Sequence, residues 1–418
     1  MAGKDHLVFV RVVFVNDSVP HCFHGGGGVT AYSMVKALAG RGLDVNVVAL
    51  ASSQHNGNAR EKDHIQHLKS ELGVGVNILK PSEGPRGRRR WPTFKDQFPS
   101  VHQAGALLKR VDDLRPDVLL GYHWAALGAM YNVAGKLKVG IVGDPVHLPE
   151  LFRREIFKRS KARKSVTRKI RERLLSGWNV KTQERGMVKL LNSCARSGAF
   201  AAHHAEDLQR WGAVDCQYFR TPTPDPNATS KRQGPKFKIM HIGHLKGVAT
   251  IAGLEILADP VLPNLEKVLG HEGFEIHLVG GFFDELPSEL RQKLIHAAVK
   301  IRGQINPPDE EFLTSHLLLV PTPIELGIRV RIITAFSFGA CIVAHRANCK
   351  GIPELKDGYN CLLGNDGFEL ASACLRIYRD PELRRKLEAG SRETYDQFFS
   401  ITVAGGRVAH VTEEIVGR

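Results

Sequence analysis

The chain has 418 residues, 43% of them hydrophobic, so it is long enough to bury large cores and to form two domains. No apolar run approaches the roughly 20 residues that a helix needs to span a bilayer. The seven cysteines are an odd number without a Cys-x-x-Cys pair, which argues against a disulfide framework and a structural zinc site.

The amino-terminal segment predicts a buried strand over residues 7–15. Its apolar run is interrupted by Arg11 and has no small-residue cleavage site after it, so a core strand is a better interpretation than a signal peptide. We therefore expect a cytoplasmic protein.

A run of four glycines follows this strand, in HGGGGVTAY at residues 24–32. A helix is predicted over residues 30–41. No Cβ is present at Gly25, Gly26, Gly27 or Gly28, so a ligand could approach the backbone amides at the start of this helix. A Rossmann dinucleotide site is disfavoured, because the third glycine of its motif falls on Thr30 and the next strand has no acidic residue at its end. The alternative is an ordinary strand-to-helix turn.

Further strands at residues 44–50, 118–120 and 139–142 alternate with helical segments, which predicts a doubly wound parallel sheet. Asp144 and His147 follow the last of these strands. The sequence Tyr-His-Trp after residue 121 is a candidate for contact with a ligand, although a histidine near a strand end is often structural. No Ser/His/Asp triad or metal cluster is indicated by the spacing.

The excess positive charge, +15 overall, is concentrated in two segments. Residues 152–173 contain eleven Lys or Arg against two acids, and residues 86–90 contain four arginines beside Trp91. Such runs are often solvated surfaces; alternatively they bind an anionic partner such as a phosphorylated lipid headgroup or an acidic glycan. Nucleic acid is a weaker candidate, because no recognisable binding module is present.

The stretch TPTPDPNATSKRQGPK, residues 221–236, breaks the periodic pattern and predicts an interdomain linker. A second alternation then begins, with strands predicted at residues 237–242, 274–279, 317–321 and 341–344. The sequence thus predicts an α/β protein with two similar domains, 1–225 and 237–401.

Residues 315–363 are the most informative part of the chain. An apolar strand, a polar loop over residues 322–327, a helix predicted over residues 329–338 and a second strand follow one another. Arg329 and Arg331 lie in the first turn of that helix, where a diphosphate would be bound by charge and by backbone amides. The alternative is a β-α-β unit whose arginines are solvated.

This stretch resembles the donor-binding signature of family 4 glycosyltransferases, retaining enzymes of the GT-B fold. Gly327, Arg329 and Arg331 match the variant signature of Gly, Arg, Lys and Glu at fixed offsets, whereas Thr334 replaces the glutamate that grips the donor ribose in that family. Glu325 lies near the position of the glutamate that contacts the transferred sugar. Residues 352–363, IPELKDGYNCLL, resemble the second strand of the signature and its following loop.

The sequence KIMHIGHLKG, residues 238–247, also resembles that family. Gly243 and Lys246 match the signature, and His244 replaces an arginine. The resemblance implies that Lys246 neutralises the leaving diphosphate without a metal, and that Gly25 to Gly28 approach the donor phosphate and sugar. It also implies a functional histidine or acid near the end of the strand at residues 139–142, for which Asp144 and His147 are both candidate catalytic residues. The Tyr-His-Trp sequence is a further candidate, for contact with the acceptor.

The resemblance implies two Rossmann-like domains facing a cleft, with the final helix, residues 402–418, joined to the first domain. It also implies a glycosyltransferase that uses a nucleotide-diphosphate sugar as donor, with no cofactor and no metal. The acceptor would be anionic or membrane-proximal, and the protein would contact the inner membrane surface through residues 152–173. The alternatives are a GT-B protein that acts as a binding or scaffold subunit, because of Thr334 and His244, and a GT-B epimerase, whose cleft carboxylates cannot be located here.

Overall fold

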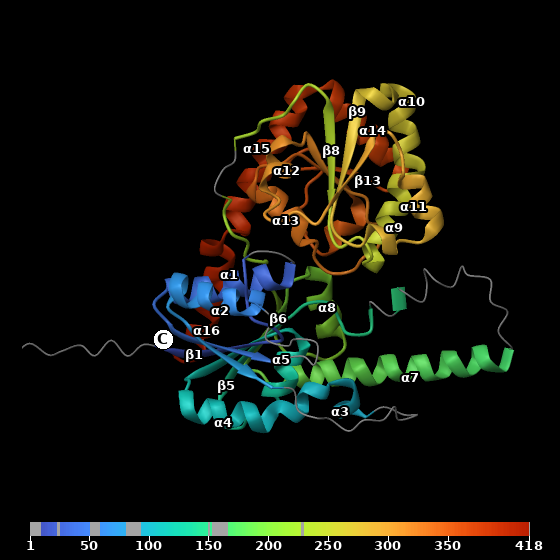
Figure 1. Cartoon of the computed structure of the whole chain (residues 1–418). Helices are drawn as coiled ribbons and strands as arrows, with labels where there is room; N and C mark the ends of the chain where they lie inside the picture. Colours follow the sequence, from blue (N-terminus) through green and yellow to red (C-terminus); the bar gives the residue numbers. More distant parts are fainter. Residues whose placement is uncertain are drawn as a thin grey trace, which may run out of the picture. The chain divides into compact units, whose positions relative to one another are not determined.

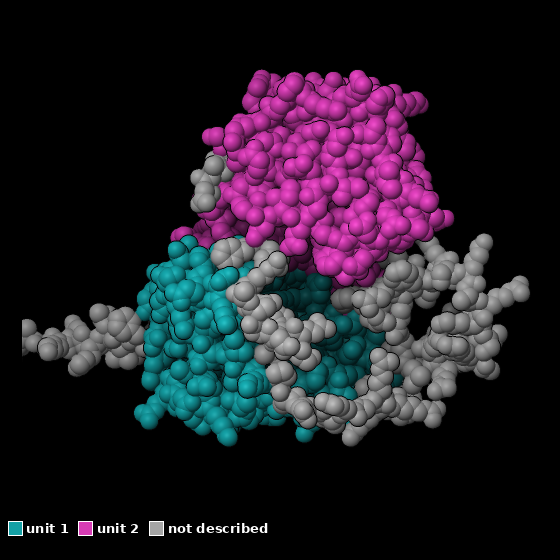
Figure 2. Space-filling view, viewed as in Figure 1, with its two compact units in different colours: residues 1–147, 161–222, 404–418 teal, residues 148–160, 223–403 magenta. Residues whose placement is uncertain are grey.

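The computed structural model describes residues 10–22, 26–50, 59–80, 93–148, 151–152, 166–226 and 230–417. The chain divides into two compact units, shown in different colours in Figure 2. Unit 1 comprises residues 1–147, 161–222 and 404–418, and unit 2 comprises residues 148–160 and 223–403. The division falls after Pro222, within the segment predicted as the linker.

Unit 1 is built on a seven-stranded sheet in the order β3-β2-β1-β4-β5-β6-β7, and all its strands are parallel (Figure 1). The strands are β1 (Arg11–Asn16), β2 (Asp44–Leu50), β3 (Gly75–Leu79), β4 (Val118–Tyr122), β5 (Leu137–Val142), β6 (Arg196–Ala199) and β7 (Cys216–Tyr218). Its central strands are almost continuously apolar and buried, as expected for a parallel sheet covered on both faces.

The helices of unit 1 connect these strands in the doubly wound manner. The longer ones are α1 (Gly26–Gly40), α2 (Ala59–Leu72), α4 (Ala104–Leu114), α5 (His123–Met130), α7 (Val166–Leu191), α8 (Ala202–Arg210) and the carboxyl-terminal α16 (Gly406–Glu414). Helix α16 packs on α1, where Arg41 Nη2 lies 2.8 Å from Glu413 Oε2. The end of the chain therefore belongs to the same compact unit as its beginning.

Unit 2 has a six-stranded parallel sheet in the order β10-β9-β8-β11-β12-β13. The strands are β8 (Phe237–Ile242), β9 (Phe274–Val279), β10 (Val299–Gly303), β11 (Leu317–Val320), β12 (Ile342–His345) and β13 (Leu362–Gly364). The helices are α9 (Val248–Ile256), α10 (Leu262–Gly273), α11 (Ser288–Leu294), α12 (Asp309–Thr314), α13 (Val330–Ser337), α14 (Gly367–Arg379) and α15 (Pro381–Phe398).

Two apolar cores cover the two faces of this sheet, so unit 2 has three layers (Figure 1). Helices α9, α10, α11 and α14 supply one core, to which Ile239 and Leu319 of the sheet contribute. Helices α12, α13 and α15 supply the other, to which the neighbouring Met240 and Leu318 contribute. The alternation of successive strand residues between two cores explains why these strands are apolar throughout.

The span from Val248 to Gly273 is the one described segment long and apolar enough to cross a membrane, judged by length and composition only. More than half of its most apolar window is buried inside unit 2. The backbone at Asp259 is not helical and divides the span into separate helices. These features are those of core helices in a packed α/β unit.

The two parallel sheets confirm the predicted α/β class, and the predicted strands at residues 44–50, 237–242 and 274–279 match β2, β8 and β9. Two helix starts differ from prediction. Helix α1 begins at Gly26, so that Gly26 to Gly28 form its first turn and not a loop. Helix α13 begins at Val330, which leaves Arg329 as its N-cap residue.

The segment at residues 352–363 also differs, since it is mostly a turn-rich loop that enters β13 only at Leu362. Both strongly basic segments lie outside the described residues for the most part. Residues 86–91 and 153–165 are not described, and of residues 166–173 the structure gives only the backbone, at the start of α7.

A fully buried histidine in unit 2 makes the stability of the fold depend on pH. His241 lies in β8, with its Nδ1 3.0 Å from the Leu319 carbonyl oxygen. Burial, and secondly the charge of Arg331, lower the pKa of His241 to about 3 from its ordinary value of 6.5. Between these two pH values the unfolded chain binds a proton that the native state does not, so stability falls as the pH falls below 6.5.

We expect His241 to reduce the free energy of unfolding by up to about 1.4 kcal/mol for each pH unit below 6.5. Urea unfolding at about pH 7 and about pH 5 measures this dependence. In a His241→Asn variant, whose amide can still donate to the Leu319 carbonyl, the dependence should be weaker even if the variant is less stable at every pH. Equal pH dependence in the native and variant proteins would contradict the assignment.

Candidate functional site

Each sheet has a topological switch point, the place where strand order reverses and where open α/β sheets bind ligands beyond the strand carboxyl ends. In unit 2 it lies between β8 and β11, and in unit 1 between β1 and β4. Most of the predicted site residues lie in the segments that follow these four strands. The two switch points are described separately below.

Arg331 joins the two strands at the switch point of unit 2. This residue lies in the first turn of α13, and its Nη1 donates to the Ile242 carbonyl oxygen at 2.6 Å, at the end of β8. Its Nη2 donates to Thr322 Oγ1 at 3.1 Å, just beyond β11. The guanidinium is thus fixed by two segments that are far apart in sequence.

Two glycines make this arrangement sterically possible. A Cβ on Gly243 would lie 2.3 Å from Arg331 Nη1, so a side chain there would displace the guanidinium. Gly280, directly after β9, has φ of +149°, and a Cβ on it would lie 1.9 Å from the Gly243 carbonyl oxygen. The close approach of the β8 and β9 carboxyl ends therefore requires glycine at both positions.

The electrostatics at Arg331 favour an anion. Burial, and secondly the neighbouring Arg329 charge, lower the pKa of the Arg331 guanidinium, which stays cationic at neutral pH because arginine starts from so high a value. Its Nε is buried and has no hydrogen-bond partner. Among the described residues Arg331 has a carbonyl and a hydroxyl as partners and no carboxylate. A cation that is partly withdrawn from water, with no counter-charge among the described residues, is costly unless an anion binds.

The residues just before α13 add a second cation to this site. Gly327 has φ of +30°. Arg329 is the N-cap residue, and its Nη2 donates to the Ile324 carbonyl oxygen at 3.3 Å. The two predicted diphosphate ligands of α13, Arg329 and Arg331, are therefore at the helix amino terminus, where its dipole also favours negative charge.

Two other predicted donor ligands have internal partners. Glu325 lies in the exposed loop after β11, with its Oε2 2.7 Å from Lys350 Nζ. The Thr334 hydroxyl donates to the Val330 carbonyl oxygen, one turn earlier in α13, at 3.1 Å. In this conformation the Thr334 hydroxyl hydrogen is bonded to a backbone carbonyl oxygen of its own helix.

Lys246 lies in the turn between β8 and α9. This turn follows Ile242, whose carbonyl oxygen accepts a hydrogen bond from Arg331. Its ammonium is held by the segment that follows β9: Nζ lies 2.9 Å from Glu285 Oε2 and 3.9 Å from the centroid of the Phe282 ring. His244, which replaces an arginine of the resembled signature, contacts the edge of the same ring, with centroids 4.8 Å apart.

The switch point of unit 1 brings a histidine to the glycine turn. Gly26, Gly27 and Gly28 form the first turn of α1, after β1, whereas Gly25 lies outside the described residues. His123, directly after β4, has φ of +70°, and its Nε2 would lie 3.4 Å from a Cβ on Gly27. Burial lowers the pKa of His123, so its imidazole is neutral at pH 7.

The two predicted catalytic residues of unit 1 follow β5. Asp144 Oδ1 lies 3.7 Å from Nδ1 of the buried His204, and the Asp144 carbonyl oxygen accepts from Trp124 Nε1 at 2.8 Å. His147 is buried against Trp211, with ring centroids 5.4 Å apart, and burial lowers its pKa. The side chains that a Cβ in the glycine turn would meet are those of His123, at Gly27, and His21, at Gly28.

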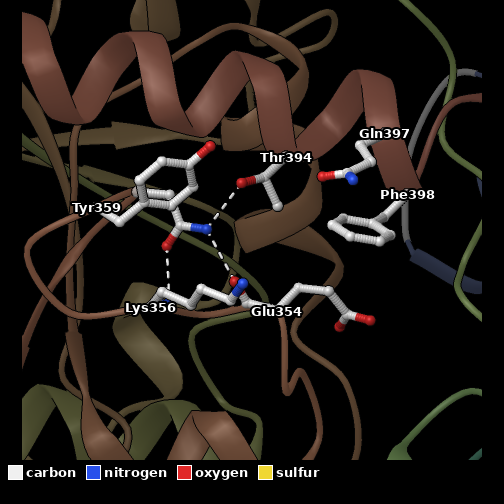
Figure 3. Close-up of a pocket in the computed structure, with 7 residues that line it drawn as sticks. Glu354, Lys356, Tyr359, Thr394, Gln397 and Phe398 are labelled. Carbon is white, nitrogen blue, oxygen red and sulfur yellow. Dashed lines mark hydrogen bonds between the residues drawn. The ribbon is translucent and has the colours of Figure 1, made fainter.

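A separate cavity of about 140 Å³ lies between α15 and the loop that precedes β13 (Figure 3). Asn360 fixes that loop: its Nδ2 donates to the Glu354 carbonyl oxygen and to Thr394 Oγ1, both at 2.8 Å. None of the predicted donor ligands lines this cavity. In the described ranges, no group of three or more His, Cys, Asp or Glu side chains is arranged to hold a metal ion.

Residues 236–380 match the family model of glycosyl transferases group 1. They span β8 to the end of α14, and so include Gly243, Lys246, Glu325, Arg329 and Arg331. The match lies wholly within unit 2. No curated protein sequence matches the chain.

Solved structures resemble the whole chain at low sequence identity. HepE from Anabaena, in complex with UDP and glucose, is 14% identical with a TM-score of 0.68, over 97% of this chain and 100% of HepE. The chain has the GT-B fold. Sucrose-phosphate synthase from Thermosynechococcus elongatus is 13% identical with a TM-score of 0.69, over 97% and 99% of the two chains. A TarM variant from S. aureus, in complex with fondaparinux, alpha-GlcNAc-glycerol and UDP, is 10% identical with a TM-score of 0.67, over 97% and 99%.

Several residues of the unit 2 site escaped sequence reasoning. Thr322 holds Arg331, Gly280 allows the close approach of two strand ends, and Phe282 and Glu285 hold Lys246. The glycine pair directly after the strand at residues 274–279 was a usable signal, because glycines at a parallel strand end often permit close backbone approach. Nothing in the sequence pairs Lys246 with Glu285.

Gly280→Ala should reduce the free energy of unfolding by roughly 2 to 4 kcal/mol, because alanine is strained at positive φ and its Cβ would overlap the Gly243 carbonyl oxygen. Gly281→Ala is the matched control. Gly281 does not have a positive φ, and the nearest atom to its Cβ would be 3.8 Å away, so the loss there should stay below about 1 kcal/mol. Urea denaturation of both variants measures the difference, and equal losses would contradict the close approach.

Proposed function

We propose that this protein is a retaining glycosyltransferase that transfers a sugar from a nucleotide-diphosphate sugar to an anionic or membrane-proximal acceptor. The observation that carries the proposal is Arg331, a cation fixed at the switch point of unit 2 without a carboxylate partner among the described residues. The group 1 glycosyl transferase match over residues 236–380 supports the same activity.

The donor is proposed from the chemistry of this site. Arg329 and Arg331 at the amino terminus of α13 suit a diphosphate, since guanidinium groups form charge-assisted hydrogen bonds to phosphate oxygens. Gly243 leaves room for the Arg331 guanidinium beside the end of β8. The structures of HepE and TarM, which have the same fold, contain UDP.

The proposed transfer step depends on stabilising the negative charge of the leaving group. As the glycosidic bond to the diphosphate breaks, negative charge develops on the leaving oxygen, and Arg329, Arg331 and Lys246 stabilise it more strongly than they stabilise the ground state. Glu325 orients the donor sugar through its hydroxyl groups. The acceptor hydroxyl attacks from the leaving-group side, which retains the configuration, and no enzyme residue forms a covalent intermediate.

Unit 1 contributes the groups that contact the sugar and the acceptor. The glycine turn Gly25 to Gly28 admits the donor phosphate and sugar, and Asp144 and His147 remain our candidates for the catalytic groups of this unit. His123 joins them, because a neutral imidazole beside the glycine turn can donate to or accept from a sugar hydroxyl. An anionic or membrane-proximal acceptor is proposed because residues 152–173 are strongly basic.

A binding or scaffold role is the second candidate, and two observations favour it. The Thr334 hydroxyl hydrogen bonds to its own helix, and His244 contacts Phe282 where the resembled signature has an arginine. A protein that binds the nucleotide and transfers no sugar would fit both observations. Turnover measurements distinguish the candidates.

Arg331→Ala and Arg329→Ala should each weaken nucleoside diphosphate binding by roughly 1.5 to 3 kcal/mol, the range for hydrogen bonds to charged groups. Isothermal titration calorimetry with UDP, ADP and GDP measures the effect. Arg379→Ala is the control, since Arg379 ends α14 at the edge of the sheet opposite the strand carboxyl ends.

Unchanged affinity in both site variants, with the fold intact by circular dichroism, would contradict the donor-site assignment. A panel of nucleotide sugars then tests activity. Transfer or hydrolysis of any donor supports the glycosyltransferase, whereas tight binding of nucleotide without turnover of any donor supports the scaffold role.

The basic segment should bind acidic membranes through charge. Sedimentation with vesicles that contain acidic lipids should show binding that falls steeply with added salt, because such charges are screened over about 8 to 10 Å near physiological ionic strength. Replacing Arg163, Lys164, Arg168 and Lys169 by glutamine should remove most of this binding and leave nucleotide affinity unchanged. Equal binding to acidic and neutral vesicles would contradict membrane binding through charge and would indicate that the segment is a solvated surface.

A further inference from the structure

Lys246 is held by two different interactions with one segment, the connection between β9 and α11. Its ammonium lies over the Phe282 ring at 3.9 Å from the centroid and forms an ion pair with Glu285 at 2.9 Å. Both side chains of the ion pair are partly exposed, at 39% for Lys246 and 56% for Glu285. This cation therefore already has a counter-charge, whereas Arg331 has no carboxylate partner in the part of the chain that the structure describes.

Phe282 adopts a backbone conformation that is costly for a bulky side chain. Its φ of +72° and ψ of +29° lie in the left-handed region, which non-glycine residues seldom adopt. The residue is 43% exposed, and its ring contacts both His244 and Lys246 of the β8–α9 turn. Strained residues of this kind concentrate at ligand sites, where the surrounding structure holds them for a role in binding.

The turn that carries Lys246 is also the turn that meets Arg331. Ile242, whose carbonyl oxygen accepts from Arg331 Nη1, and Gly243, which leaves room for that guanidinium, come directly before it. An anion bound by Arg331 would therefore lie near the start of this turn. Glu285 and such an anion would compete for the same ammonium group.

We propose that Glu285 and Phe282 hold Lys246 in a resting position, and that the donor diphosphate replaces Glu285 as its partner. Glu285 is then a positioning residue that weakens donor binding, and Phe282 keeps the ammonium close to the site during the exchange. The inference rests on the proposed function, because it takes Lys246 to be a ligand of the donor. It adds two residues that lie outside the resembled signature.

The first experiment is a double-mutant cycle in the full chain, measured by calorimetric titration with UDP, ADP and GDP. Glu285→Gln should bind the recognised diphosphate roughly two- to fivefold more tightly, the range expected for release of an exposed ion pair. In a Lys246→Gln background the same change should have no effect, because the residue through which Glu285 acts is missing.

The matched control is Asp259→Asn. Asp259 also forms an exposed ion pair, with Lys293 at 3.6 Å, but it lies beyond the far end of α9. Its removal should leave diphosphate affinity unchanged. A gain from Glu285→Gln that persists in the Lys246→Gln background would show simple charge repulsion and overturn the proposal, as would the absence of any gain.

A second measurement does not depend on the nucleotide. Acetylation of Lys246 by an amine-reactive reagent, followed by mass spectrometry, should be slower in the native protein than in Glu285→Gln, because the ion pair holds the amine against the Glu285 carboxylate and the Phe282 ring. Phe282→Gly should also accelerate it, and glycine adopts the φ of this position without strain. Equal rates in all three proteins would overturn the resting position.

The two experiments separate the inference from the proposed function. If the native protein binds none of the diphosphates, the proposed function fails and the effect of Glu285 on donor affinity fails with it. The acetylation rates still decide whether Glu285 and Phe282 hold Lys246. If the native protein binds a diphosphate and the cycle shows no coupling, the proposed function stands and the inference fails.

Discussion

The unit 2 site depends on one side chain, Arg331, which bonds to the end of β8 and to the segment after β11. A guanidinium can form both bonds at once because its donors are held in a rigid fork. The geometry places a cation where two parallel strands diverge, and the described residues supply no carboxylate to neutralise it. The free energy that this burial costs the unliganded protein is recovered when an anion binds, so the ligand should stabilise the native state.

The two units use the same topology with different chemistry at the switch point. In unit 2 the residue beyond the central strands is a permanent cation, and glycines at Gly243 and Gly280 bring the backbone close to it. In unit 1 the corresponding side chain is His123, half-buried and neutral, against the glycine turn that starts α1. A permanent cation suits a phosphate, and a neutral imidazole suits a hydroxyl group. This difference supports a donor phosphate in unit 2 and sugar or acceptor groups in unit 1.

The sequence was informative where local pattern determines structure. Strands β2, β8 and β9 could be predicted because each is a short apolar run that both faces of a parallel sheet bury. The start of α1 could not be predicted, because glycine disfavours helix formation. Only the structure shows that a side chain on Gly28 would overlap the His21 ring. Ile242, one partner of Arg331, is 89 residues away, and Glu285, the partner of Lys246, is 39 residues away, and no local pattern encodes such pairings.

The predicted donor ligands fall into two classes, according to how much free energy each would lose by exchanging its present partner for the donor. Lys246 and Glu325 are each in an exposed ion pair, and pairs of this kind contribute so little that a ligand can replace one partner at small cost. Among the described residues Arg331 has no ionic partner to lose, and its bonds to backbone and hydroxyl can persist when an anion binds at the amino terminus of α13. Affinity for the diphosphate should therefore come mainly from Arg331 and Arg329. The exposed pairs then adjust that affinity, because each must exchange its partner before it contacts the donor.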